Sequence, residues 1–250
     1  MWVSTALDTL RPFLQPLYAW VHCGAPKGVP LSLPDAVRFA LSFWRTALLK
    51  GPGEVPSEAW SRSSTRLLGD AKADEDSVRV GGFELLEDGR PLSQCRWFSE
   101  EITPSNAPWA FARQGLAQRC IGALELLTSL MLVVAFGPQG PGASVILPGV
   151  TDNQGNSYIV ARLFTRQHPS AAILMELAAQ LRSRGIALDL EWRRRDLNQD
   201  ADDLTEYRFD NFSSAHRVRL DISSMPWLVL NEMLVAGSLL AEARVSTRTG

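Results

Sequence analysis

The strongest constraint on the fold is a run of almost uninterrupted apolar residues from about Leu116 to Phe136. A helix over this run is apolar nearly all round, so it has to be covered on several sides. Gly137 to Gly142 (GPQGPG) ends it. Its most apolar part, Ile121 to Phe136, is shorter than the ~20 residues of a membrane span and carries Glu125. We therefore expect the buried helix of a layered domain, with no membrane as partner.

The composition is that of a globular protein with no overall basic field. Of the 250 residues, 46% are hydrophobic and 21% charged, and the formal net charge is −2. This length suffices for one ordinary domain with extensions. A nucleic-acid partner would have to be bound by a local basic patch, because the chain as a whole does not attract polyanions.

The cysteines and the N-terminus favour an intracellular location, cytoplasmic or nuclear, and no secretion. The three cysteines are widely spaced without a CxxC pair, and the three histidines are scattered. A disulfide framework and a zinc site are therefore not expected. Charged residues and prolines (Asp8, Arg11, Pro12, Pro16) interrupt what would be the apolar core of a signal peptide.

The chain divides into three regions. Residues 1–60 are rich in proline and tryptophan and include a predicted helix over Ala36 to Leu49, followed by a linker over Lys50 to Pro56. Residues 61–210 form the predicted main domain. Residues 211–250 are a tail with a predicted helix over Trp227 to Ala243.

The main domain is predicted to be α/β, with elements in the order βββαβααβα. Three closely spaced strands indicate an antiparallel meander, and the later strands alternate with helices, so we expect a mixed five-stranded sheet flanked by helices. The strands are predicted over Thr65–Leu68 (ending at Asp70), Ser77–Leu86, Gln94–Phe98, Ser144–Thr151 and Ala187–Arg193, and the helices over Leu116–Phe136, Ser157–Phe164, from Ile173 to near Gly185, and Ala201–Tyr207.

Four acidic residues occupy positions where a catalytic site would use them. Asp70 closes the first predicted strand, Glu125 interrupts the apolar helix, Asp152 closes the fourth strand, and Asp202 opens the last helix. If the first and fourth strands are parallel neighbours, Asp70 and Asp152 meet at one edge of the sheet, where ligand sites of such sheets cluster. Clustered carboxylates repel one another, and Mg²⁺ or Mn²⁺ relieves the repulsion.

Each of these residues also has a purely structural interpretation. An Asp at a strand end is usually turn chemistry, and an Asp near a helix start favours the helix dipole. Glu125 can face solvent at a helix edge. Only the combination of the four carboxylates in this order points to a site.

Four local motifs resemble the ribonuclease H domain of a retroelement reverse transcriptase. Asp70-Ala71-Lys72-Ala73, with Gly81-Gly82 downstream, is similar to the first strand and hairpin of that family. Ala123 to Leu127 (ALELL) resembles its helix with the catalytic Glu, and Thr151 to Gln154 (TDNQ) its Thr-Asp-Ser/Asn motif. Asn198 to Leu204 (NQDADDL) resembles its closing Asn-x-x-Ala-Asp-x-Leu motif.

The resemblance spans residues 64–207 and implies a ribonuclease H-like fold with a two-metal nuclease site. Asp70, Glu125, Asp152 and Asp202 would then be catalytic and would bind two Mg²⁺ or Mn²⁺ ions for hydrolysis of the RNA strand of an RNA–DNA hybrid. The polar and basic residues expected to contact the nucleic acid, or to orient the carboxylates, are Asn153, Gln154, Arg193, Arg194, Arg195 and Asn198.

The same resemblance bears on the rest of the chain and leaves alternatives open. Residues 9–22 look like the segment upstream of this domain in retroelement polyproteins, and no Tyr-x-Asp-Asp polymerase motif occurs. Residues 1–60 would bind a polymerase domain or a second copy of the chain. The alternatives are a decayed retroelement remnant that at most binds nucleic acid or protein, and another nuclease or an integrase on the same fold.

Overall fold

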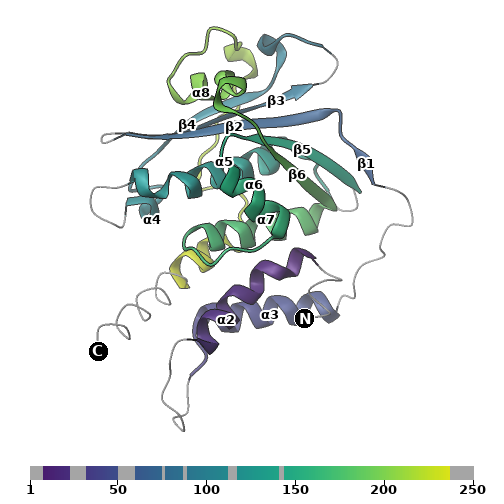
Figure 1. Ribbon diagram of the computed structural model, residues 1–250, viewed down its shortest axis with the longest axis vertical. Helices are drawn as coiled ribbons and strands as arrows, with labels where there is room; N and C mark the ends of the chain where they lie inside the picture. Colours follow the sequence, from purple (N-terminus) through teal and green to yellow (C-terminus); the bar gives the residue numbers. More distant parts are fainter. Residues whose placement is uncertain are drawn as a thin grey trace. The chain divides into compact units, whose positions relative to one another are not determined.

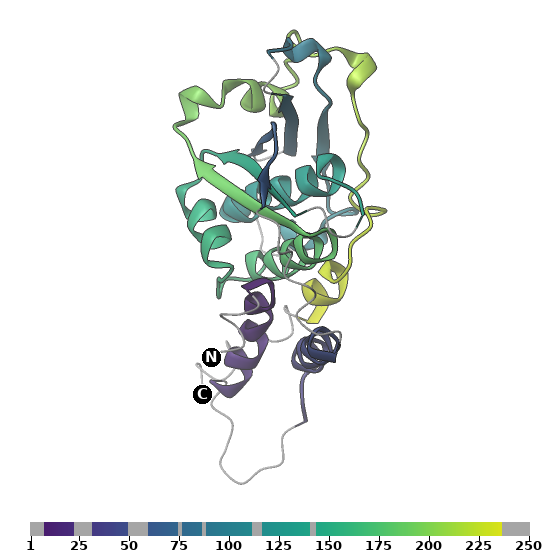
Figure 2. The same cartoon turned by 90° about the vertical axis from the view of Figure 1, so that its right-hand side faces the viewer.

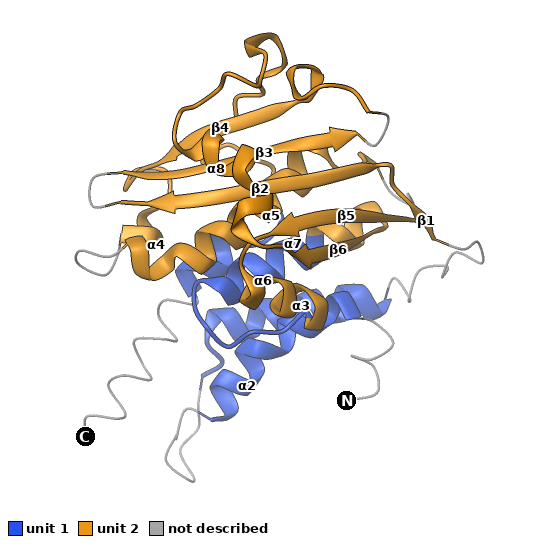
Figure 3. Cartoon of the chain, turned by 45° about the horizontal axis from the view of Figure 1, so that its top comes forward, with its two compact units in different colours: residues 1–57, 163–179, 227–250 blue, residues 58–162, 180–226 orange. Residues whose placement is uncertain are grey.

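The computed structural model describes residues 8–22, 32–49, 60–74, 77–86, 89–111, 117–140 and 144–236. It comprises two compact units (Figure 3). Unit 2 contains residues 58–162 and 180–226, and unit 1 contains residues 1–57, 163–179 and 227–250. The predicted boundaries at residues 60 and 210 stay a prediction. All four candidate carboxylates belong to unit 2.

Unit 2 is built on a mixed six-stranded sheet in which β2, β3 and β4 form an antiparallel meander (Figure 1). The other pairings, β5 with β1, β2 and β6, are parallel (Figure 2). The strands are β1 (Ser61–Arg62), β2 (Thr65–Ala73), β3 (Val78–Leu86), β4 (Trp97–Ile102), β5 (Val145–Thr151) and β6 (Ile186–Trp192). This pairing confirms the predicted mixed α/β sheet, with an antiparallel meander followed by parallel strands, and adds the short β1 as a sixth strand.

The helices follow the predicted order. The longer ones are α3 (Asp35–Leu49), α5 (Ile121–Phe136), α6 (Gln154–Arg162) and α7 (Ser170–Arg184). The shorter ones are η1 (Asp8–Leu14), α2 (Gln15–Val21), η2 (Leu92–Gln94), α4 (Pro108–Phe111), η3 (Ala117–Cys120), η4 (Arg195–Leu197), α8 (Gln199–Thr205) and η5 (Ser214–His216).

A proline inside β5 is tolerated because the neighbouring strand is interrupted beside it. Since β6 occupies one edge of β5 along its whole length, β1 and β2 share the other edge. The Ser63 backbone N–H donates to the Ile146 carbonyl at 2.8 Å, so the backbone N–H and C=O groups of even-numbered residues in β5 face β1 and β2. The backbone nitrogen of Pro148 therefore faces the point where the chain passes from β1 to β2. Its missing N–H removes no hydrogen bond between strands there.

Helix α5 covers one face of the sheet, and glycines let it approach closely (Figure 1). A Cβ at Gly69 would lie 2.7 Å from Cγ2 of Thr128, and one at Gly82 would lie 2.9 Å from Cδ2 of Leu132. At its other end, buried Arg184 donates to the Val133 and Val134 carbonyls at 3.0 and 3.3 Å, a favourable place for a cation at a helix C-terminus.

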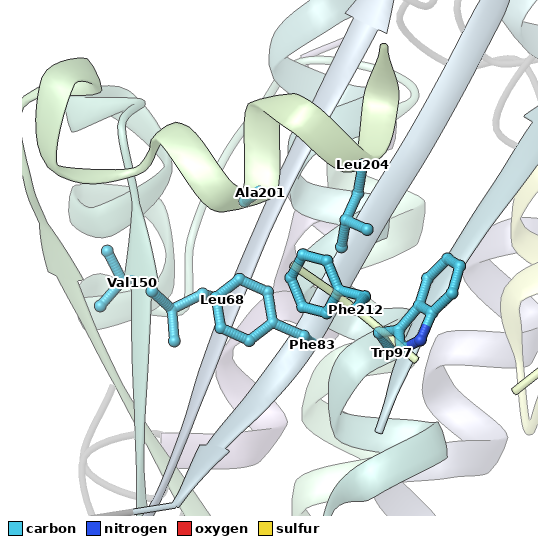
Figure 4. Packing of buried hydrophobic residues seen from close by; sticks show 7 residues of the cluster. All are labelled: Leu68, Phe83, Trp97, Val150, Ala201, Leu204 and Phe212. Carbon is cyan, nitrogen blue, oxygen red and sulfur yellow. The ribbon is translucent and has the colours of Figure 1, made fainter. Parts of the chain in front are cut away.

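Helix α8 covers the opposite face over a small aromatic core (Figure 4). Leu68 of β2 and Phe83 of β3 are partners across the antiparallel pair, and side chains alternate along a strand, so Asp70 lies on the same face as Leu68. The core consists of Leu68, Phe83, Trp97, Val150, Ala201, Leu204 and Phe212. This packing fixes α8, and with it Asp202, on the face that carries Asp70.

Unit 1 has its own packing. Phe13 of η1 stacks on Phe43 of α3 with ring centroids 3.8 Å apart. The carboxylate of Glu176, fully buried, accepts the backbone N–H groups of Leu228, Val229 and Leu230 at 2.6–3.0 Å. It thereby caps the helix that begins at Leu230, near the predicted start at Trp227.

Two strand predictions were wrong in their bounds. Asp70 does not close its strand, because β2 continues to Ala73 in register with β3 as far as Val78. The third strand covers Trp97–Ile102 instead of Gln94–Phe98, since Leu92–Gln94 form a 3-10 turn. The predicted linker over Lys50 to Pro56, and the tail helix beyond residue 236, lie outside the described residues.

The apolar helix, which belongs to unit 2, is largely buried. Ala117–Phe136 is long and apolar enough for a membrane span by length and composition, with a mean hydropathy of 1.8. However, 67% of its most apolar part is buried inside the protein. Leu124, Leu126, Leu127 and Leu130 are fully buried, as predicted for a helix that is apolar on all sides.

Candidate metal and nuclease site

Three of the four predicted carboxylates converge. Asp70 comes from the middle of β2, Glu125 from the second turn of α5, and Asp152 from the residue after β5. One carboxylate oxygen from each residue lies within 4.8 Å of those of the other two. Strand pairing brings the two aspartates together, because Leu68 of β2 pairs with Val150 of β5 and each aspartate follows its paired residue by two positions.

Asp70 is the most deeply buried of the three, with 4% of its surface exposed. Burial raises the pKa of its carboxyl group from 3.8 to about 7, and the nearby Asp152 carboxylate adds to the rise. Arg195 acts against this rise in pKa. Without an added cation, Asp70 therefore retains a proton up to neutral pH, which is unusual for an aspartate.

Glu125 is positioned by two amide side chains from the start of α6. Its pKa is raised from 4.5 to about 7, chiefly by burial, with a hydrogen bond from Asn153 acting in the opposite direction. Asn156, which is 2% exposed, donates from Nδ2 to Oε2 of Glu125 at 3.4 Å and to the Gly122 carbonyl at 2.9 Å. These contacts orient the Glu125 carboxylate relative to α6.

Asp152 is held through its backbone and leaves a carboxylate oxygen unused. The indole N–H of Trp192, at the end of β6, donates to the Asp152 carbonyl at 3.0 Å. The Oδ1 atom of Asp152 is buried and has no hydrogen-bond partner. A buried carboxylate oxygen without a donor is costly, so this atom is well suited to a cation ligand.

The donor set fits a hard divalent cation. Three carboxylates supply only oxygen ligands, which Mg²⁺ and Mn²⁺ prefer, whereas zinc and copper sites in proteins usually include nitrogen or sulfur ligands. The raised pKa values of Asp70 and Glu125 and the unpartnered Oδ1 of Asp152 all indicate an excess of negative charge that such an ion would neutralise. Asp70, Glu125 and Asp152 are therefore the residues that can hold a metal ion.

Asp202 lies near this group but is already paired. Its Oδ1 accepts a hydrogen bond from Nη2 of Arg195 at 2.5 Å, and its Oδ2 accepts one from Nε2 of Gln199 at 3.3 Å. Nη2 of Arg208 lies 3.7 Å from the same Oδ2. Asp202 adds to the raised pKa of Asp70, which indicates that the two carboxylates interact, but it is not one of the three that meet.

The other predicted residues fall into two groups. Asn153 and Asn198 have structural partners: Oδ1 of Asn153 accepts the Asn156 backbone N–H at 3.1 Å, and Asn198, 3% exposed, donates from Nδ2 to the Gly69 carbonyl at 3.3 Å. Gln154, Arg194 and Arg195 are exposed, and Arg193 is half-buried. Arg193 and Arg194 form ion pairs with Glu191 and Asp196.

Four contributors to the site were not predicted from the sequence: Asn156, Trp192, Gln199 and Arg208. The sequence places Asn156 four residues after Asp152, but its burial and its contact with Glu125 are recognisable only in the structure. Arg208 is recognisable only in space, because a turn after α8 brings it back to Asp202 and Asp203.

A comparison with protein-family models gives no match, and a comparison with curated proteins also gives none. Among solved structures, the chain is similar to RNase H1 from the halophilic archaeon Halobacterium salinarum, with 16% identity and a TM-score of 0.37 over 60% of this chain and 98% of that one. It is similar to the N-terminal RNase H domain of a Mycobacterium tuberculosis protein, with 16% identity and a TM-score of 0.37 over 60% of this chain and 94% of that one. The strand order and register on their own establish the mixed sheet.

Proposed function

We propose that this chain is a metal-dependent nuclease of the ribonuclease H type, which hydrolyses the RNA strand of RNA–DNA hybrids. The observation that carries the proposal is the convergence of Asp70, Glu125 and Asp152 within 4.8 Å, with a buried Asp152 oxygen left unpartnered. A group of carboxylates that is costly without a cation suits the metal ions that catalyse phosphodiester hydrolysis, and the exposed arginine loop beside it suits a phosphate backbone.

The residues around the site have distinct roles in this proposal. Mg²⁺ or Mn²⁺ ions, when bound, supply an activated water and stabilise the leaving oxygen of a phosphodiester. Asp70, Glu125 and Asp152 bind these ions and orient them, while hydrogen bonds from Asn153 and Asn156 fix the Glu125 carboxylate. Trp192 fixes the position of Asp152 through its backbone carbonyl. Asp202 is the fourth carboxylate, and in the free protein it is paired with Arg195.

The loop after β6 is the proposed contact with the nucleic-acid backbone. Arg194 and Arg195 expose 73% and 70% of their side chains, and planar guanidinium groups suit phosphate oxygens. Gln154, also exposed, follows Asp152 by two residues. Such contacts to phosphate and sugar recognise the shape of a hybrid and its 2′-hydroxyl groups and do not read base sequence.

The proposed origin is a retroelement polyprotein, and the motif resemblance of residues 64–207 supports it. We also propose an intracellular location, cytoplasmic or nuclear. On α3, Leu41 and Leu48 are 42% and 52% exposed and lie seven residues apart on one side of the helix. An exposed apolar pair of this kind supports a partner for residues 1–60, either a polymerase domain or a second copy.

Cleavage of a labelled RNA–DNA hybrid by the purified full chain tests the proposal. We expect cuts in the RNA strand with Mg²⁺ or Mn²⁺, none with EDTA, and a loss of at least about a hundredfold in Asp152→Asn. Asp189→Asn is the matched control, because Asp189 lies on β6 and its ion pair with Arg62 is a surface contact. Cutting of duplex DNA instead would indicate another nuclease or an integrase. A folded protein that cuts no hybrid with either ion would contradict the proposal. It would favour a decayed retroelement remnant that at most binds nucleic acid or protein.

A further inference from the structure

Asp202, the fourth carboxylate, differs from the other three because it forms an ion pair with an arginine side chain. Arg195 contacts Oδ1 of Asp202 at 2.5 Å, while Gln199 donates to Oδ2 at 3.3 Å. Asp202 therefore has both oxygens engaged, whereas Asp152 has a buried oxygen without any partner. The site thus contains three carboxylates in need of a cation and a fourth whose charge is already balanced.

The side chains of Arg195 and Asp202 differ strongly in burial. Asp202 exposes 12% of its side chain and lies between Ala201 and Leu204 on α8, both of which are fully buried against the sheet. Arg195 exposes 70% of its side chain on the loop after β6. The guanidinium can therefore leave without opening a cavity, while the carboxylate stays in place.

The charge balance limits what the free protein can bind. One divalent ion nearly balances Asp70, Glu125 and Asp152, and Arg195 already balances Asp202. A second divalent ion close to Arg195 would be repelled by the guanidinium charge and would gain little attraction from the Asp202 carboxylate, which Arg195 already neutralises. If Arg195 moves away, Asp202 becomes available as an oxygen ligand, and the total of four negative charges matches two divalent ions.

We propose that the guanidinium of Arg195 holds the place of a second divalent ion, so that the free protein binds one ion firmly and a second only as Arg195 leaves Asp202. This inference rests on the proposed function, because it assumes that the three convergent carboxylates bind the first ion. Arg195 is then a positioning residue that controls the loading of the site. A substrate phosphate, which attracts guanidinium groups, is the chemistry that would draw Arg195 away.

Calorimetric titration of the full chain with Mn²⁺ in 150 mM KCl tests this, with circular dichroism to show that each variant is folded. We expect one ion to bind wild-type protein and a second to bind at least about tenfold more weakly. Arg195→Ala should strengthen the second binding event about tenfold and the first by less than threefold. The double variant Arg195→Ala/Asp202→Asn should lose that gain, because it lacks the carboxylate that Arg195 releases.

Arg194→Ala is the matched control, because it removes a like charge one residue away whose partner is Asp196, at 3.1 Å. Both dissociation constants should stay within about twofold. A second dissociation constant in Arg195→Ala that is within twofold of wild type, or a gain equally large in Arg194→Ala, would overturn the proposal while first-ion binding and hybrid cleavage remain. Absence of any Mn²⁺ binding to wild-type protein would overturn the proposed function as well.

Discussion

Asp70 of β2 lies directly opposite Gly81 of β3, and the lack of a side chain at Gly81 lets α8 pack on the face of the sheet that carries Asp70. A Cβ at position 81 would lie 2.7 Å from Cβ of Leu204 and 3.3 Å from the backbone nitrogen of Thr205. Because these are atoms fixed to the helix backbone, they cannot turn aside. The glycine thus determines how close Asp202 comes to Asp70.

Gly81→Ala should therefore push α8 away from the sheet. Overpacking of this kind costs about 1–3 kcal/mol of stability. Urea unfolding should show this loss at an unchanged m-value, and binding of a second ion should weaken with it. An unchanged midpoint would mean that α8 is not closely packed at this position.

The metal-free protein should lose stability as the pH rises. The pKa values of Asp70 and Glu125 are about 7 in the folded chain, against 3.8 and 4.5 for the unfolded groups. Both groups bind more protons when folded, so their contribution is complete below pH 4 and is lost as the pH rises to about 7. Thermal unfolding in EDTA should show a lower Tm at pH 8 than at pH 5.

Asp70→Asn should remove about half of this pH dependence, because Glu125 remains, and should stabilise the metal-free fold at pH 8. A shift of about three pKa units at about 1.4 kcal/mol each sets an upper limit on the order of 4 kcal/mol for this residue. Asp189→Asn, which removes an exposed carboxylate, should leave the pH profile of Tm unchanged. If the profile of Asp70→Asn matches that of wild type, Asp70 is not the group responsible.

Divalent ions should reverse the loss of stability that the metal-free protein shows at high pH. An ion that binds only the folded chain stabilises it by mass action, and it competes with protons for the carboxylates. The rise in Tm caused by 5 mM Mg²⁺ should therefore be larger at pH 8 than at pH 6 and should vanish in Asp152→Asn. An equal rise in that variant would place the stabilising ion elsewhere.

Asn156→Ala should weaken ion binding without removing a ligand. Its amide positions Glu125 and satisfies the Gly122 carbonyl, and loss of a residue that orients a ligand typically costs about tenfold or more in metal affinity. Asn211→Ala is the control, since the Asn211 amide bonds Asp200 at 3.2 Å on the surface. Mn²⁺ titration of the two variants gives the comparison. Equal affinities would show that Asn156 plays no part in ligand orientation.

The sequence predicts the sheet and four site carboxylates, of which Asp70, Glu125 and Asp152 converge, because local patterns determine the positions of these three. The apolar run around Glu125 requires a covered helix, and the turn after Thr151 places Asp152 at a strand end. Parallel pairing of β2 with β5 then brings Asp70 and Asp152 together. Even Pro148, which is unfavourable in a central strand, fits because the chain between β1 and β2 lies beside it.

The features that were not predicted depend on tertiary packing, and several of them have partners far away in the chain. The polar residues of β4 hide the apolar pattern by which a strand is predicted. They are accommodated in the fold because Ser99 donates to the Leu204 carbonyl at 2.7 Å and Glu100 accepts the Leu220 backbone N–H at 3.0 Å. Asn156 has its partners on α5, some 30 residues away. The ion pair of Asp202 with Arg195 depends on how the loop after β6 folds back onto α8, which no short motif specifies.

Anomalous diffraction from crystals of the full chain soaked in Mn²⁺ would locate the ion directly. The account predicts a peak within about 2.0–2.6 Å of carboxylate oxygens of Asp70, Glu125 and Asp152, with Oδ1 of Asp152 among the ligands. It also predicts that Asp202 remains on Arg195 at the lowest ion concentrations. A peak elsewhere, or none at these three carboxylates at millimolar Mn²⁺, would contradict the claim that they form a metal site.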